Sequence, residues 1–93
     1  LKEEAFADAN ENDLNTLGYQ FLFAGKFDEA IEIFKKNIEM NPGSWNVYDS
    51  LGEGYMNKGE NELASKYYSK ALEIAPENQQ ERIKGTLTQL KAK

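Results

Sequence analysis

Apolar and small residues along this chain recur at the spacing of one helical face, and the whole pattern then returns after 34 residues. The first copy of the pattern consists of Leu14, Leu17, Gly18, Phe21, Ala30, Phe34 and Pro42. The second copy consists of Tyr48, Leu51, Gly52, Tyr55, Ala64, Tyr68 and Pro76. The first four positions of each copy fall at i, i+3, i+4 and i+7, which is typical of an amphipathic α-helix. A pattern that returns at one fixed offset indicates a structural repeat.

The spacing predicts an all-α protein in which each copy contains two helices, ended by a proline that the α conformation does not tolerate. Five helices are expected, at about residues 12–24, 28–40, 45–58, 61–74 and from 78 onward. Asn10 or Asn12 is the expected N-cap of the first helix, and Ser44 that of the third.

Three positions concern the packing of these helices. Gly18 and Gly52 are predicted to let a neighbouring helix approach closely, facing the aromatic residues of the second helix of each pair. Gly54 lies inside a predicted helix, where glycine costs about 1 kcal/mol relative to alanine. Asn37 stands where the second copy has Ala71, and we expect it to weaken the core.

The fifth helix departs from the repeat. At an offset of 34 residues the landmarks would be Arg82, Gly85, Thr86 and Gln89, which cannot form an apolar stripe. Moved by one residue they become Ile83, Thr86, Leu87 and Leu90. The helix is therefore predicted to close the apolar end of the array as a polar-faced cap, and we expect the C-terminus to be the native one.

The period and the landmarks resemble the tetratricopeptide repeat, whose unit is a pair of antiparallel helices. The resemblance implies antiparallel helical hairpins stacked as a short α-α superhelix. The expected organisation is a linker or short docking helix, two repeat units and a capping helix, over residues 1–10, 11–44, 45–78 and 79–93. It also implies a non-catalytic module for protein-protein interaction.

Composition restricts the partners. The net charge of −5 argues against a nucleic-acid-binding surface, and no apolar run approaches the ~20 residues of a membrane span. Residues 1–62 carry most of the acids and residues 63–93 an excess of bases, which fits either solvated helix faces or end-to-end stacking into a weak homo-oligomer. Without cysteine the compartment stays open between cytoplasm and periplasm.

Catalytic chemistry has few candidates. The chain has no histidine or cysteine and no Ser-x-x-Lys sequence. Its closely spaced acids, such as Asp49 and Glu53, are typical of solvated helix faces. We therefore predict no catalytic residue, no metal site and no cofactor.

In repeats of this kind the first helix of each pair lines a concave groove. The predicted partner-binding residues on the first helix are Asn12, Asn15, Tyr19, Leu22 and Phe23. Those on the third helix are Asn46, Asp49, Glu53, Met56 and Asn57. Tyr19 and Phe23 lie one turn apart and are expected to form an exposed aromatic pair, unless residues 1–9 or the last helix cover them.

The charge of this predicted groove favours some ligands over others. Some members of the resembled family bind acidic peptides through lysine, arginine and asparagine, but Asp49 and Glu53 would repel such a ligand. The predicted partner is a protein or peptide with an apolar or basic segment. One candidate is an upstream domain of the same chain, and the alternative is a self-associating module.

A further resemblance concerns residues 44–53 together with Leu17-Gly18-Tyr19, which are similar to tetratricopeptide tails of some bacterial serine hydrolases, including β-lactamase-related enzymes. It implies an accessory domain whose catalytic part lies upstream of Leu1. We interpret the start at Leu1 as a segment excised from a longer protein or a processed one. Trp45 is then either a docking anchor or a residue packed between the repeats.

Overall fold

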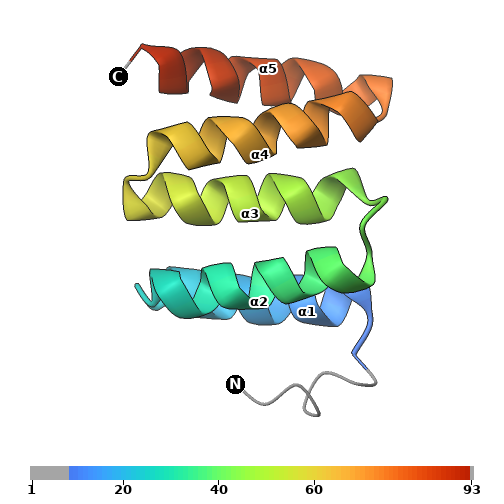
Figure 1. Ribbon diagram of the computed structural model, residues 1–93, viewed down its shortest axis with the longest axis vertical. Coiled ribbons are helices and arrows are strands. Elements are labelled where there is room, and N and C mark those ends of the chain that lie inside the picture. Colours follow the sequence, from blue (N-terminus) through green and yellow to red (C-terminus); the bar gives the residue numbers. More distant parts are fainter. Residues whose placement is uncertain (1–8, 93) are drawn as a thin grey trace.

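The computed structural model describes residues 9–92, and within them the chain is almost entirely helical (Figure 1). Its helices are α1 (Glu11–Phe23), α2 (Phe27–Met40), α3 (Trp45–Lys58), α4 (Asn61–Ile74) and α5 (Glu77–Lys91). The all-α prediction is confirmed, and the expected start of every helix lies within one residue of the observed start. Local periodicity was sufficient because each helix carries its own apolar stripe and its own stop signal.

The helices form two hairpins and a closing helix. α1 packs against α2, α3 against α4, and α5 against α4, while α2 and α3 join the two hairpins. Gly25 and Gly59 make the turns within the hairpins, with φ angles of 77° and 88°. These angles lie in the left-handed region that favours glycine, so both turns use the same residue 34 positions apart.

Each hairpin is held by a glycine that lies directly under an aromatic ring. A Cβ atom at Gly18 would overlap the Phe34 ring, and one at Gly52 would lie 2.9 Å from Tyr68 Cδ2. Both rings are buried, at 0% and 3% exposure. The predicted close approach of the helices is therefore confirmed at both repeats, by the same pair of residues shifted by 34 positions.

Gly54 and Asn37 have structural roles that the sequence did not suggest. A Cβ atom at Gly54 would lie 3.1 Å from Ile31 Cγ1, so this glycine lets the second hairpin stack closely on α2. The fully buried Asn37 donates from Nδ2 to the carbonyl of Glu11 (3.1 Å) and accepts at Oδ1 from Asn41 (2.8 Å). Both ends of its amide are satisfied, which corrects the expectation that Asn37 simply weakens the core.

The helix starts differ in their chemistry. Asn10 caps α1, because its Oδ1 accepts from the amide of Asp13 (2.8 Å) and the Asp13 carboxylate accepts from the amide of Asn10 (3.3 Å). Ser44 occupies the N-cap position of α3 but makes no side-chain cap, which corrects the expectation above. Its hydroxyl instead donates to Glu11 Oε2 (2.9 Å) and ties the start of α3 to the start of α1.

α5 packs on α4 in the shifted register. Ile83 and Leu90 are buried, Leu87 is half-buried, and Lys84 and Gly85 are exposed. This arrangement matches the stripe expected of a cap. Most of the predicted linker or docking helix at residues 1–10 lies outside the described residues.

Replacing Gly18 by alanine tests the close contact between the helices. The added methyl group overlaps the Phe34 ring, so we expect Gly18→Ala to lower the free energy of unfolding by about 1–3 kcal/mol. Gly85→Ala is the matched control, because nothing lies within 4 Å of that position on α5, and it should gain up to about 1 kcal/mol. Urea denaturation of both variants measures the two signs, and equal stabilities would contradict the packing described here.

Candidate functional site

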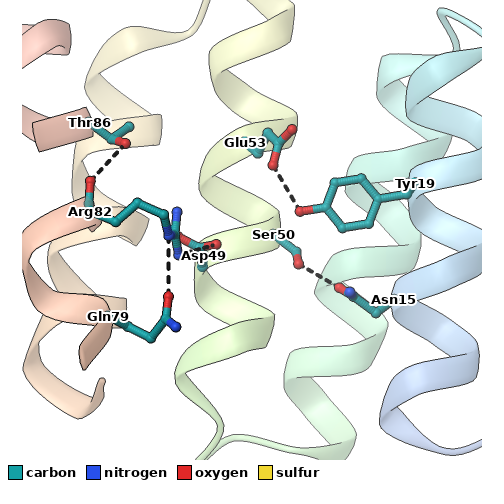
Figure 2. Close-up of polar contacts among 8 residues, drawn as sticks. All are labelled: Asn15, Tyr19, Asp49, Ser50, Glu53, Gln79, Arg82 and Thr86. Carbon is teal, nitrogen blue, oxygen red and sulfur yellow. Dashed lines mark hydrogen bonds and ion pairs between the residues drawn. The ribbon is translucent and has the colours of Figure 1, made fainter. Parts of the chain in front are cut away.

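α1, α3 and α5 present their side chains side by side, and we call this surface the inner face (Figure 2). Asn15 and Tyr19 project from α1, three polar residues project from the middle of α3, and Arg82 reaches across from α5. The helices are thus joined on this side through polar side chains. The apolar core lies between them and the other two helices.

Two hydrogen bonds join α1 to α3, one turn apart on each helix. The Tyr19 hydroxyl donates to Glu53 Oε1 (2.9 Å), and the Ser50 hydroxyl donates to Asn15 Oδ1. The ring of Tyr19 also packs edge to face on Phe34, with the centroids 5.2 Å apart. Tyr19 is therefore fixed by the core at its ring and by α3 at its hydroxyl.

Two phenols and two carboxylates share this region. Burial raises the pKa of the Tyr19 hydroxyl well above its usual value, and the Glu53 and Asp49 charges raise it further, although a hydrogen bond with Ser50 acts the other way. Burial likewise raises the pKa of Tyr68, followed by the charges of Asp49 and Glu53. Both tyrosines therefore stay neutral, and neither can neutralise the acidic side chains.

Asp49 is paired with a residue that the sequence did not indicate as part of the site. Arg82 Nη2 lies 3.1 Å from Asp49 Oδ2, and Arg82 Nε donates to Gln79 Oε1 (3.3 Å) on its own helix. The guanidinium also lies over the Trp45 ring, 6.0 Å from its centroid. Arg82 follows Asp49 by 33 residues, close to one repeat length, and this spacing was the available signal.

The Asp49 carboxylate is only partly satisfied by this partner. Its Oδ1 atom is buried and has no hydrogen-bond partner in the described part of the chain. Burial raises the pKa of Asp49, while the hydrogen bond and the charge of Arg82 lower it by less. The carboxylate thus keeps a free acceptor position beside a cation.

The structure distributes the ten predicted residues over three environments. Leu22 and Asp49 are buried, at 4% and 7% exposure, and Leu22 belongs to the core. The half-buried residues are Asn15, Tyr19, Asn46, Glu53 and Met56. The exposed residues are Asn12, Phe23 and Asn57.

Phe23 is the residue of this set most available to a partner. Its side chain is 80% exposed, and its ring lies 5.7 Å from that of Tyr19 at a tilt of 31°. Asn57, by contrast, donates its amide to the carbonyl of Glu53 on its own helix (2.8 Å). The predicted residues therefore include one exposed aromatic ring beside a hydrogen-bonded network.

The trait searches give a simple result for residues 9–92. They contain no group of three or more acidic, histidine or cysteine side chains placed to hold a metal ion. None of the helices in that range is both long and apolar enough to cross a membrane.

A helical-repeat architecture with a side-chain-lined inner face defines the class of this protein. Residues 14–44 and residues 45–78 each match the tetratricopeptide repeat, and the chain belongs to the tetratricopeptide repeat family. Repeats of this family generally mediate protein-protein interaction. The family and its named relatives point to a non-catalytic repeat module.

Three similar proteins come from different organisms and differ greatly in length. The Superkiller complex protein 3 of Homo sapiens is 33% identical over 66% of this chain, and the BBSome complex member BBS4 of Bos taurus is 35% identical over 74%. The chloroplastic tetratricopeptide repeat domain-containing protein PYG7 of Arabidopsis thaliana is 29% identical over 76%. The chain spans only 4%, 14% and 25% of the lengths of these relatives. The resemblance of residues 44–53 to hydrolase tails stays a prediction.

The pairing of Asp49 with Arg82 predicts a pH-dependent variant. A carboxyl whose pKa is raised in the folded state binds more protons there, so its contribution to stability falls as the pH rises above the usual 3.8. Arg82→Gln removes the group that lowers this pKa, so the variant should lose more stability near pH 7 than near pH 3. Urea denaturation at both pH values measures the difference. Lys84→Gln, an exposed neighbour on α5, is the control, and equal losses for Arg82→Gln at both pH values would contradict the prediction.

Proposed function

We propose that the inner face binds an apolar or basic segment of a protein partner and that this chain performs no catalysis. The observation that carries the proposal is the ring of Phe23, which is 80% exposed and stacked on Tyr19 at the end of α1. An aromatic ring left in water is costly to solvate, and aromatic residues are enriched where interfaces gain most of their binding energy.

The charge beside this aromatic pair indicates the chemistry of the partner. Glu53 accepts a hydrogen bond from the neutral Tyr19, and within residues 9–92 no cationic side chain pairs with it. Its negative charge is therefore uncompensated, unlike that of Asp49. A segment with apolar groups for Phe23 and a cation for Glu53 satisfies both features, whereas an acidic segment would be repelled.

The source of the segment has two candidates. One is another protein, a view supported by two relatives that are named as members of complexes. The other is an upstream domain of the same polypeptide, which includes the case of an accessory domain of a serine hydrolase. Both use the same surface, so one binding experiment addresses both. Self-association through the inner face is the competing function.

Phe23→Ser tests the proposal directly. We expect the chain to bind a synthetic peptide of alternating leucine and lysine, and Phe23→Ser to weaken this binding by about tenfold or more. Met40→Ser is the matched control, since Met40 is the other exposed large apolar residue, at 39%, and lies at the end of α2. Fluorescence anisotropy of the labelled peptide measures the affinities, and circular dichroism checks the fold.

Three results would count against this assignment. Equal binding by Phe23→Ser and the wild type would place the site elsewhere. Equal binding of a leucine-glutamate peptide would contradict the charge preference. A concentration-dependent dimer that Phe23→Ser dissociates, detected by light scattering in the absence of peptide, would favour self-association instead.

A further inference from the structure

We infer that Trp45 and Asp49 form a recognition site for an arginine side chain of the partner, and that Arg82 occupies this site in the free protein. The inference rests on the proposed binding of a basic segment to the inner face. It goes beyond that proposal by naming the chemical group that is recognised and the internal group that competes with it.

The site has the two components that a guanidinium group requires. The Asp49 carboxylate is an acceptor whose side chain is only 10% exposed, and the Trp45 ring provides an aromatic face within reach of the same cation. Oδ1 of the carboxylate is buried without a hydrogen-bond partner in the described residues. A buried carboxylate oxygen normally finds a donor, so the unused acceptor indicates capacity for a further hydrogen bond.

Arg82 uses this site incompletely. It reaches one carboxylate oxygen through one nitrogen, 3.1 Å away, while its Nε is turned to Gln79. Its side chain stays 50% exposed, and its distance of 6.0 Å from the Trp45 ring is at the outer limit of a cation-π contact. An arginine that donates to both carboxylate oxygens would form a stronger, bidentate pair. The geometry therefore favours exchange of Arg82 for such a ligand.

The position of the site on α3 supports a ligand that runs along the inner face. Asp49 and Glu53 lie one turn apart on the same helix, and Glu53 adjoins the aromatic pair at Tyr19. A basic segment that binds Glu53 therefore reaches Asp49 with its next cationic side chain. Arginine is preferred over lysine here, because its planar group both pairs with a carboxylate and stacks on an indole ring.

The test compares two variants that remove one positive charge each from α5. Arg82→Gln removes the internal competitor, whereas Lys84→Gln removes an exposed charge that pairs only weakly with Glu81, 3.9 Å away. The probes are a synthetic peptide of alternating leucine and arginine and the same peptide with citrulline, a neutral analogue of the same shape. Fluorescence anisotropy measures the affinities, and the emission of Trp45, the single tryptophan of the chain, reports on the site itself.

We expect Arg82→Gln to bind the arginine peptide about tenfold more tightly than the wild type, because the site is no longer occupied in the free protein. Lys84→Gln should bind it as the wild type does or change by less than about twofold. The citrulline peptide should show no gain with Arg82→Gln. Saturation of the wild type with the arginine peptide should change the Trp45 emission.

Each alternative result has a separate meaning. Equal affinity of the wild type and Arg82→Gln for the arginine peptide overturns this inference and leaves binding at the inner face intact. An unchanged Trp45 emission at saturation does the same. Failure of every variant to bind either peptide overturns the proposed function itself. Should Arg82→Gln lose its helical signal, Gln79→Ala replaces it, since it releases only Nε of Arg82 and should also raise the affinity.

Discussion

The contact between a glycine and an aromatic ring in each hairpin determines much of the rest of this structure. Phe34 lies against Gly18, and Tyr68 lies against Gly52, so each pair of helices approaches as closely as its backbones allow. The same two rings extend to the inner face. Phe34 supports the ring of Tyr19 from behind, and the hydroxyl end of Tyr68 lies within the field of the α3 carboxylates. Core packing and the geometry of the candidate binding surface therefore depend on the same residues.

The acidic character of the chain is less informative than the pairing of its individual carboxylates. Asp49 and Glu53 are one turn apart, yet the first lies beside a guanidinium group and the second beside a neutral phenol. A count of charges treats them as equivalent. Their surroundings make one carboxylate partly compensated and buried, and leave the other as the charge that an approaching cation meets first.

The sequence allowed the helices, their turns and the shifted register of α5 to be predicted, because these depend on local periodicity and on glycine and proline. It did not reveal contacts whose partners come from another helix. Ser44 has the composition of an N-cap, but the Glu11 carboxylate of α1 lies close enough to accept its proton. Asn37 and Arg82 likewise acquire their roles only once the hairpins are stacked. The exposed Phe23 could be predicted because nothing one repeat away is placed to cover it.

The two sides of the stacked hairpins are joined by different kinds of contact. On one side Gly54 lies against Ile31, and this separation is fixed by close backbone packing. On the inner face, the α1-to-α3 joint consists of the side chains of Tyr19 and Asn15 with their hydrogen-bond partners on α3. Side-chain torsions change at far lower cost than a packed backbone contact. The curvature of the array is therefore an elastic property, stiff against compression at the glycine side and compliant against opening at the tyrosine side.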